Sequence, residues 1–574
     1  MAKTFFYVFY TSVRIVEVFM FINNNFNRYN IGFKQNIGNN IGNNYNVQTS
    51  SAPQPKTQSP YQNGEVRTRN LYANDLHGIL KGYRKLITVK ERFDAESKNN
   101  PDIVYSTYLS GDGSVGANRP KNNLIILLEN FINARAKTPG NHEFDDEGSQ
   151  GLSKLMDNSK VKTLALNLVT APNSSLQDDI DAGRLAKSMI FEENGQKFGV
   201  IGLIPSDLYM RINQQSKDKS KDIDVLNLSD TIKALQQEVN KMEAQGVNKI
   251  TVLSHMGYDA DIAIAKAVNG VDIIHGAHSH DLLKGLQPNV NYFLSQRGEP
   301  IIITQASKNG HWYGILDVVY DKNGKIINAS NDVKSLDAEK DSLKAVLAER
   351  MMIGHPVKIG NLVHEVKSMS EAVLDESPMC SFLCDAYKEY TGADIVLNNA
   401  GTMRNTLQQG DVTDRVIIDM MPYYNNISTY RLSEKDILTA INNGIEATKK
   451  YHRTGALQVA GMSYIIGHDG KIKEAYLLKD DGTKEPMNVQ NPREDKFYTV
   501  AYNSFLSGGT ECLEILHAPE KLIKTFDKNE TDLLIDYFKS FNNKPLSIDK
   551  TGRISHENNP ESNPKTRVVK REQQ

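Results

Sequence analysis

The chain has 574 residues, of which 39% are hydrophobic and 24% charged, and its formal net charge is −2. This length exceeds one ordinary domain, so we expect two to four domains that each bury a core. The small net charge excludes the basic field that would hold a nucleic-acid polymer, and a small anionic substrate would need local positive charge such as bound metal ions.

The three cysteines are too few for a disulfide framework, and their number is odd. None forms a Cys-x-x-Cys pair, so we reject a thiolate zinc site. Cys380 and Cys384 are spaced like neighbours on a helix, which predicts core packing.

The first 64 residues predict no folded domain. Phe5 to Ile22 is largely apolar, but Arg14 and Glu17 interrupt it, so it fits a membrane span or a secretory signal poorly. A poor signal or anchor and a non-functional leader stay open as alternatives. Residues 23–64 are rich in Asn, Gln, Ser and Gly, which favours a disordered leader. The sequence ends without a hydrophobic tail, which argues against a lipid-anchor signal there.

From about residue 66, short apolar runs alternate with amphipathic stretches, which predicts an α/β domain. We assign this first domain to residues 65–336, a linker helix to 337–353, a second domain to 354–550 and a polar, frayed tail to 551–574. The expected strands and helices include Val104–Leu109, Thr163–Leu168, Phe198–Ile204, Ser229–Glu243, Lys249–Leu253, Ala260–Val268, Val271–Ile274 and Pro300–Thr304.

Five short segments carry Asp, Asn and His side chains, and four of them follow a predicted strand. Strand ends far apart in the sequence meet at one edge of an α/β sheet, where ligands bind. Asp75 and His77 are two apart, as are His278 and His280, so each pair projects to one side of an extended segment. The segments are Asn74-Asp75-Leu76-His77-Gly78, Ser110-Gly111-Asp112, Gly140-Asn141-His142-Glu143-Phe144-Asp145, Ser254-His255-Met256-Gly257 and His275-Gly276-Ala277-His278-Ser279-His280.

This mixture of ligands suits a particular chemistry. Carboxylate oxygen and imidazole nitrogen bind Zn²⁺, Mn²⁺ and similar ions. One carboxylate can bridge two ions about 4 Å apart, which clamp a phosphate and acidify a shared water, so that the resulting hydroxide attacks phosphorus in line. Each segment alone is more often a turn or a structural hydrogen bond, but the five in this order favour a two-metal phosphoesterase.

The set resembles the calcineurin-type metallophosphoesterase signature, in the form typical of the 5′-nucleotidase family. The resemblance implies an N-terminal β-sandwich flanked by helices, a helical linker and an α+β substrate-binding domain. It implies that His142 stabilises the transition state and that Asp145 orients His142. It also implies two divalent ions, one held by Asp75, His77, Asp112 and His280, and the other by Asp112, Asn141, His255 and His278.

The resemblance extends over most of residues 354 to 515. Ala393 to Arg404 resembles the family segment ending in Gly-Gly-x-Arg, which puts Asn399 and Arg404 on substrate-binding positions. Met421-Pro422-Tyr423-Tyr424-Asn425 resembles Leu-Pro-Phe-x-Asn, so Tyr423 and Asn425 would face the nucleoside. Tyr498 to Gly509 resembles the other half of an aromatic clamp, with Phe505 as the opposing ring. Without the resemblance, a surface arginine and core-packed rings are the better interpretation.

Four departures from the family pattern affect the substrate more than the reaction. Thr402 replaces a glycine, and Thr510-Glu511 follow Gly508-Gly509 where the family has Asp. The loop from Phe505 is one residue short. The stretch Glu376-Ser377-Pro378-Met379-Cys380 lacks an expected basic residue.

The leading hypothesis is hydrolysis of nucleoside 5′-monophosphates. One alternative keeps the site but changes the substrate to a cyclic nucleotide, a nucleotide sugar or a non-nucleotide phosphoester. Another is a non-catalytic surface or particle-associated binding protein. The family resemblance favours a secreted or surface protein, and the sequence leaves membrane association and oligomeric state open.

Overall fold

The computed structural model describes residues 64–367, 374–451, 456–509, 512–561 and 563–569. They form two compact units. The first contains the described residues to Ser114, Arg119–Leu208 and Lys219–His355, and the second contains Val115–Asn118, Tyr209–Asp218 and the described residues from Pro356. No helix in these described ranges has the length and apolar character that a membrane span requires.

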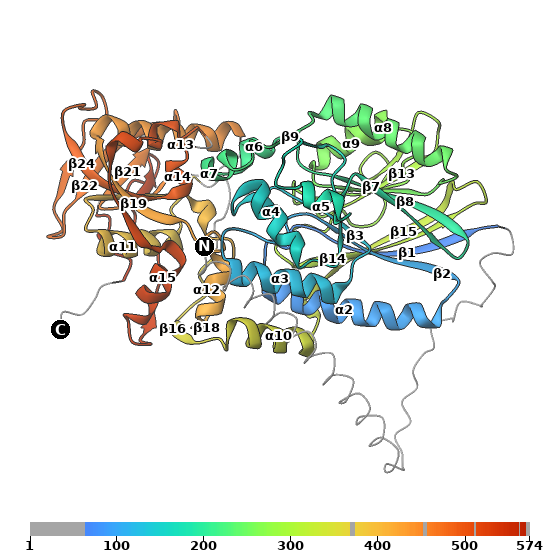
Figure 1. Cartoon of the computed structure of the whole chain (residues 1–574). Helices are drawn as coiled ribbons and strands as arrows, with labels where there is room; N and C mark the ends of the chain where they lie inside the picture. Colours follow the sequence, from blue (N-terminus) through green and yellow to red (C-terminus); the bar gives the residue numbers. More distant parts are fainter. Residues whose placement is uncertain (1–63, 368–373, 452–455, 510–511, 562, 570–574) are drawn as a thin grey trace, which may run out of the picture. The chain divides into compact units, whose positions relative to one another are not determined.

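The first unit is a sandwich of two β-sheets between layers of helices (Figure 1). The seven-stranded sheet has the order β15 (Ile326–Ser335), β14 (Trp312–Tyr320), β1 (Val66–Ala73), β2 (Ile103–Ser110), β3 (Ala136–Thr138), β4 (Lys162–Leu164) and β6 (Leu185–Ala186). The six-stranded sheet has the order β12 (Tyr292–Leu294), β13 (Pro300–Thr304), β11 (Ile273–His275), β10 (Ile250–Ser254), β8 (Gln196–Leu203) and β7 (Ser188–Glu193).

Apolar side chains of the two sheets pack into shared clusters, which close the sandwich. Val104 and Leu316 of the seven-stranded sheet pack in one cluster with Ile273 and Ile302 of the other. The outer face of the seven-stranded sheet is covered by α2 (Leu80–Asn99), α3 (Arg119–Ile132) and α10 (Leu343–Ile353). The outer face of the six-stranded sheet is covered by α8 (Leu228–Ala244) and α9 (Tyr258–Ala267).

The remaining elements of this part of the chain are short. They are η1 (His142–Phe144), α4 (Gly148–Asp157), β5 (Leu168–Thr170), α5 (Gln177–Asp181), α6 (Leu208–Arg211), α7 (Gln214–Asp218), β9 (Ile223–Val225) and η2 (Leu336–Ala338). The expected strand Thr163–Leu168 was wrong in its second half, because β4 ends at Leu164 and β5 pairs with β9 in a separate sheet.

The linker helix expected over 337–353 is shorter than the sequence predicts. The 3₁₀ turn η2 ends at Ala338, and α10 begins only at Leu343. Arg84 holds the intervening segment, because its guanidinium donates to Asp341 at 3.0 Å and its carbonyl accepts from the Ser342 N–H at 3.0 Å.

The second unit combines three sheets with helices. The five-stranded sheet has the order β20 (Gln458–Ala460), β17 (Ile395–Asn398), β24 (Phe497–Asn503), β19 (Asn426–Ser433) and β25 (Leu522–Asn529). The four-stranded sheet has the order β23 (Lys484–Pro486), β22 (Ile472–Leu478), β21 (Met462–Ile466) and β27 (Ile554–His556). The three-stranded sheet has the order β18 (Gly410–Thr413), β16 (Lys358–Leu362) and β26 (Pro545–Leu546). The longer helices are α11 (Pro378–Thr391), α12 (Asp414–Met420), α13 (Glu434–Tyr451) and α15 (Glu530–Lys539). Shorter turns are η3 (Ala400–Thr402), α14 (Ser504–Ser507), η4 (Glu514–Leu516) and η5 (Pro519–Lys521).

The five-stranded sheet is buried on both faces. Ile395 and Leu397 of β17 pack into one cluster with α13, whereas Val396 packs into the other cluster with α11 and α15. This alternation follows from the two-residue period of a strand. Cys380 and Cys384 are buried on α11, which confirms the predicted core packing.

The polar stretch after Lys550 was expected to be frayed, and this was wrong for its described residues. Ile554–His556 forms β27, which pairs in parallel with β21. The Arg553 side chain is fully buried and its guanidinium donates to Asp385 at 2.6 Å and to the Val459 carbonyl at 3.1 Å. A buried cation that is paired and hydrogen-bonded fixes its segment in place, which composition alone does not reveal.

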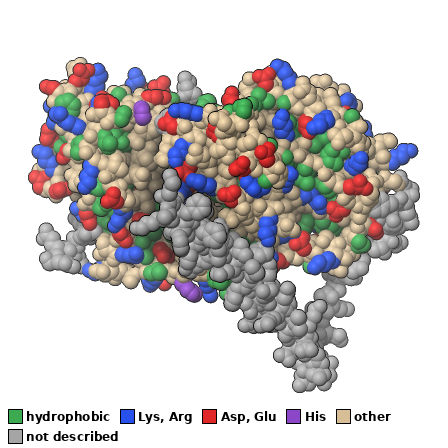
Figure 2. Space-filling model, viewed as in Figure 1, with side chains coloured by type: hydrophobic (Ala, Val, Ile, Leu, Met, Phe, Trp, Pro, Cys, Tyr) green, Lys and Arg blue, Asp and Glu red, His purple; other side chains and the backbone are tan. Residues whose placement is uncertain are grey.

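The surface carries charges of both signs. On the face shown in Figure 2, Lys and Arg side chains alternate with Asp and Glu side chains over both units. This mixture agrees with the formal net charge of −2.

Candidate metal centre and active site

The candidate metal ligands lie at the carboxyl ends of parallel strands. β1, β2 and β3 pair in parallel in one sheet, and β10 and β11 pair in parallel in the other. The two edges meet, because the Ser110 hydroxyl donates to the His275 carbonyl at 2.8 Å. The five predicted segments follow these five strands, so topology brings them to one place.

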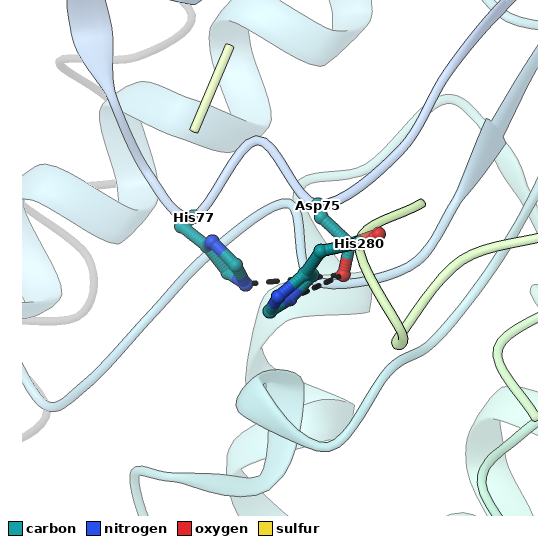
Figure 3. Close-up of side chains that lie close together, drawn as sticks. All are labelled: Asp75, His77 and His280. Carbon is teal, nitrogen blue, oxygen red and sulfur yellow. Dashed lines mark ion pairs between the residues drawn. The ribbon is translucent and has the colours of Figure 1, made fainter. Parts of the chain in front are cut away.

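Asp75, His77 and His280 form a first cluster (Figure 3). Oδ1 of Asp75 lies 3.5 Å from Nε2 of His280 and 3.9 Å from Nε2 of His77. The Asp75 and His77 side chains are buried, and His280 is partly exposed. One carboxylate between two imidazoles is a donor set that a divalent ion accepts.

Asp112 belongs to both of the other potential metal-binding groups. Its Oδ2 lies 3.1 Å from Nε2 of His255, 3.4 Å from Nε2 of His77 and 3.9 Å from Nε2 of His142. With His255 and His278 it forms a second potential metal-binding group. Asp112 therefore stands between the two predicted ligand sets, as a bridging carboxylate would.

Asn141 follows a glycine that lies against this carboxylate. A Cβ on Gly140 would lie 2.1 Å from Oδ1 of Asp112 and 2.6 Å from Nε2 of His255. A side chain there would collide with two candidate ligands. The structure thus brings all seven predicted ligands to one site, namely Asp75, His77, Asp112, Asn141, His255, His278 and His280.

Three buried atoms at this site fit a metal directly. Among the described residues, Nε2 of His77, Oδ1 of Asn141 and Nε2 of His255 are buried and make no hydrogen bond of good geometry, and both imidazole nitrogens face the Asp112 carboxylate at 3.4 and 3.1 Å. Buried polar atoms in folded proteins are nearly always hydrogen-bonded, so these three atoms beside a carboxylate indicate a place for cations.

Backbone conformation at the site is unusual. Asp75, His77, Asp112, His278 and His280 all have φ between 49° and 75°. This left-handed region costs a non-glycine residue about 1–2 kcal/mol, and such residues cluster at functional sites.

Several supporting residues were not predicted from the sequence as positioning groups. Oδ1 of Asn309 contacts Nδ1 of His77 at 2.8 Å, and the Ser110 carbonyl contacts Nδ1 of His255 at 2.8 Å. Each contact occupies Nδ1 and leaves Nε2 for a metal. Gln305 supports the loop of His278 and His280 through the Ala277 carbonyl at 3.3 Å and the Asp281 N–H.

Glu143 fastens two ligand loops to each other. Its Oε2 accepts from the N–H groups of Asp112 at 3.0 Å and Gly140 at 2.7 Å, and its Oε1 accepts from the Ser114 N–H at 2.9 Å. Glu143 therefore has a structural role between the two loops.

Electrostatics at the site favour a cation. Burial lowers the pKa of His77 to about 4. Burial also opposes the charged form of His255, but the carboxylates of Asp112 and Asp75 outweigh it and raise the pKa of His255 to about 10. The pKa of Asp112 lies well below its usual value, because the charge of His255 and its neighbours outweighs burial. The pKa of Asp75 is also lowered, because the charges of His280 and His255 outweigh its burial, so two buried carboxylates stay ionised.

His142 and Asp145 lie beside this centre. Nδ1 of His142 lies 2.7 Å from Oδ2 of Asp145, and the His142 N–H donates to Oδ1 of Asp112 at 2.9 Å. The contact with Asp145 fixes the imidazole with Nε2 on the side of Asp112. This arrangement suits the predicted role of His142, which remains a prediction.

The candidate substrate residues lie in the second unit. The Arg404 guanidinium donates to the Tyr423 hydroxyl and lies 5.1 Å from the centre of its ring. Asn399 is buried, and Asn425 donates to Glu530 at 2.6 Å.

Phe505 is partly buried and packs against the α13 cluster. The core-packing interpretation therefore holds for part of its ring, and its role in a clamp remains a prediction. Thr510 and Glu511, where the sequence departs from the family pattern, lie outside the described residues.

Comparison with known proteins finds similar chains among nucleotide-hydrolysing enzymes. The model of the 5′-nucleotidase C-terminal domain matches residues 358–517. An apyrase of Tabanus yao is 26% identical over 509 residues, covering 82% of this chain and 87% of the apyrase. A probable 5′-nucleotidase of Treponema pallidum is 26% identical over 514 residues, covering 77% of this chain and 83% of that protein.

The fold is also found among solved structures. The crystal structure of a 5′-nucleotidase precursor from Thermus thermophilus aligns with a TM-score of 0.69 and 23% identity, covering 86% of this chain and all of the other. The chain is thus similar to 5′-nucleotidases over most of its length, and residues 358–517 match the C-terminal domain of that family. These findings confirm the resemblance and the predicted α/β fold class. The relatives are named apyrase and 5′-nucleotidase, which supports a hydrolase, and the Asp and His clusters of this chain form its candidate metal site.

Proposed function

We propose that the chain hydrolyses phosphate esters at two divalent metal ions, such as Zn²⁺ or Mn²⁺, and that nucleoside 5′-monophosphates are its main substrates. The observation that carries this proposal is the gathering of candidate ligand side chains around the Asp75 and Asp112 carboxylates. The buried Oδ1 of Asn141, which has no hydrogen-bond partner, supports it. The names of the relatives, apyrase and probable 5′-nucleotidase, support a nucleotide substrate.

Asp75, His77, Asp112 and His280 would hold one ion, and Asp112, Asn141, His255 and His278 the other. When bound, the ions supply positive charge that orients the phosphate and acidifies water. Asp145 holds His142 through Nδ1 at 2.7 Å, so a protonated His142 donates through Nε2 to the charge that develops on the phosphate.

Recognition of the nucleoside is assigned to Asn399, Arg404, Tyr423, Asn425 and Phe505. The Arg404 guanidinium offers donors in a fork that matches two oxygens of a phosphate or carboxylate. Its contact with the Tyr423 hydroxyl couples the charged group to the ring proposed to stack on the base.

A second candidate keeps the reaction but replaces the mononucleotide by a nucleotide sugar, a cyclic nucleotide or a non-nucleotide phosphoester. Glu376 supports it, because this carboxylate lies in the stretch where the family pattern has a basic residue. Glu376 is buried and accepts from the Thr551 and Gly552 N–H groups at 2.8 and 2.7 Å. That stretch therefore offers the substrate no positively charged side chain.

The deciding experiment measures phosphate release from AMP, UMP, a nucleotide sugar and an aryl phosphate, with metal content determined on the same sample. The proposal predicts about two ions per chain and preference for the mononucleotides. Equal rates on all substrates would refute the nucleotide assignment. Protein without metal and without turnover in added Mn²⁺ or Zn²⁺ would favour the non-catalytic binding protein.

We also propose a secreted or surface location, which the resemblance to 5′-nucleotidases supports. The N-terminal segment that bears on this question lies outside the described residues. Fractionation of cells that express the full chain, with detection of the protein in medium, surface and interior, tests it.

A further inference from the structure

The first residue of α15, Glu530, carries a buried carboxylate with donors on both oxygens. Its side chain is fully buried. Oε1 accepts from Nδ2 of Asn425 at 2.6 Å, and Oε2 accepts from the Tyr387 hydroxyl at 2.6 Å and from Nδ2 of Asn503 at 3.2 Å. A buried carboxylate is costly without such donors, so carboxylate and donors hold one another in place.

The donors come from loops that are far apart in the sequence. Nδ2 of Asn503 also contacts Oδ1 of Asn398 at 3.2 Å and Oδ1 of Asn399 at 3.4 Å. The Ser504 hydroxyl donates to Oδ1 of Asn425 at 3.2 Å. One network therefore joins the loops 398–404, 421–426 and 503–505 through Glu530.

Backbone bonds of the same helix start strengthen this connection. The Glu530 N–H donates to the Asn425 carbonyl at 3.0 Å, and the Thr531 hydroxyl donates to the Met421 carbonyl at 2.8 Å. Both ends of the segment 421–425 are thus fixed to α15.

Each of the three loops carries a proposed substrate contact close to the network. Asn399 is part of it, Tyr423 lies two residues before Asn425, and Phe505 lies two residues after Asn503. A displacement of about 1 Å at a substrate-positioning group can cost about 10²-fold in rate. The mutual positions of these contacts therefore depend on the group that joins their loops.

We propose that Glu530 is a positioning residue for substrate recognition, which sets the mutual geometry of the Asn399, Tyr423 and Phe505 loops. The inference rests on the proposed function, because these loops matter to turnover only if the second unit binds the substrate. Glu530 acts through Asn425 and Asn503 and does not itself contact the substrate.

The test is Glu530→Gln in the full chain supplied with Mn²⁺. The amide keeps the size of the side chain, but whichever way it is turned its NH₂ group faces Asn425 or the pair Tyr387 and Asn503. We expect the KM for AMP to rise about tenfold, as for the loss of one hydrogen bond to a charged group. We expect kcat/KM for an aryl phosphate, which lacks a nucleoside, to change less than about twofold because the ligand set of the metal centre is untouched.

Glu434→Gln is the matched control. Glu434 is also a fully buried carboxylate at the first residue of a helix, α13, and it accepts from Nε of Arg493 at 3.0 Å and the Asn488 N–H at 3.1 Å. Its hydrogen bonds involve none of the three loops. General destabilisation of the unit should lower the melting temperature in both variants, whereas only Glu530→Gln should raise the KM for AMP.

Tyr387→Phe provides a milder variant in case Glu530→Gln does not fold. It removes one donor to Glu530 and keeps the carboxylate, so the KM for AMP should rise by about two- to threefold. The inference is wrong, and the proposed function stands, if the wild type prefers AMP but neither Glu530→Gln nor Tyr387→Phe changes the KM for AMP. The same holds if Glu434→Gln raises the KM for AMP as much as Glu530→Gln does. A wild type without preference for AMP over the aryl phosphate would overturn the nucleotide assignment and this inference together.

Discussion

Replacing Glu143 by Gln tests whether metal affinity depends on the hydrogen bonds that join the loops carrying the ligands. One oxygen of this carboxylate accepts from the Asp112 and Gly140 N–H groups, and the other accepts from the Ser114 N–H. Gln has one acceptor oxygen, so its NH₂ group faces at least one of these donors. A hydrogen bond to a charged group contributes about 1.5–3 kcal/mol, so the variant should lose at least that much unfolding free energy.

The larger effect should appear in metal binding. Supporting residues of metal sites typically change affinity or activity by about 10–100-fold, and Glu143 holds the backbone of Asp112 and the residue before Asn141. Competition with a chelator measures metal affinity, chemical denaturation measures stability, and phosphate release measures turnover. We expect Glu143→Gln to lose at least about tenfold in affinity for the more weakly held ion.

Asp222→Asn separates this effect from general destabilisation. Asp222 belongs to the same unit and accepts from the Ser149 hydroxyl at 2.6 Å and the Ser175 N–H at 2.7 Å, but none of its hydrogen bonds involves a candidate ligand. It should lower stability and leave metal affinity unchanged. Equal metal affinity in Glu143→Gln and wild type, at any loss of stability, would refute the reasoning.

Three further predictions concern the centre itself. Asp112→Asn should abolish turnover, because one substitution weakens the ligand set of both ions; retained phosphate release would contradict a bridging role. His142→Ala should keep its metal content and lose about 10²–10³-fold in kcat, as for removal of one transition-state donor, with metal analysis and kinetics on one sample. Metal binding should release protons near pH 8, because the pKa of His255 is raised to about 10 and only its neutral form is a ligand. Affinity should therefore rise with pH up to that value, and calorimetry in buffers of different ionisation enthalpy would show no proton release if this is wrong.

The metal ligands were predictable because their chemistry is visible in single segments. Asp75 and His77, or His278 and His280, are recognisable as pairs, and the end of a strand is a feature that apolar runs reveal. Parallel pairing then brings strand ends together without further information. The sequence therefore indicated which side chains meet, although it contained no distances.

The residues that support these ligands were not predictable in the same way. Asn309 contacts His77 at a sequence separation of 232 residues, and Gln305 reaches the loop of His278 and His280 from the neighbouring strand. Asn and Gln are common after strands, and nothing local distinguishes these two. Only the position of Asn309 one residue before a glycine, close to a strand end, gave a signal, and that signal is typical of any turn.

The second unit shows the same limit at Glu530 and Arg553. Both are charged residues in polar segments, which composition assigns to the surface. Their burial depends on partners such as Asn425 and Asp385, which lie 105 and 168 residues away. Local patterns record the charge of such a residue but not the donors and acceptors that make its burial favourable.

The strained backbone of the ligands has a structural explanation in the strands that precede them. The loops after β1 and β2 are joined by backbone hydrogen bonds, because the N–H groups of Asp75, His77 and Gly78 donate to the carbonyls of Gly111, Asp112 and Gly113 at 3.1, 2.8 and 2.8 Å. Asp75, His77 and Asp112 adopt their left-handed conformations within these paired loops. The hydrogen bonds between the loops thus offset a strain of about 1–2 kcal/mol per residue. Backbone hydrogen bonds between the two loops therefore help to position the Asp75 and Asp112 carboxylates.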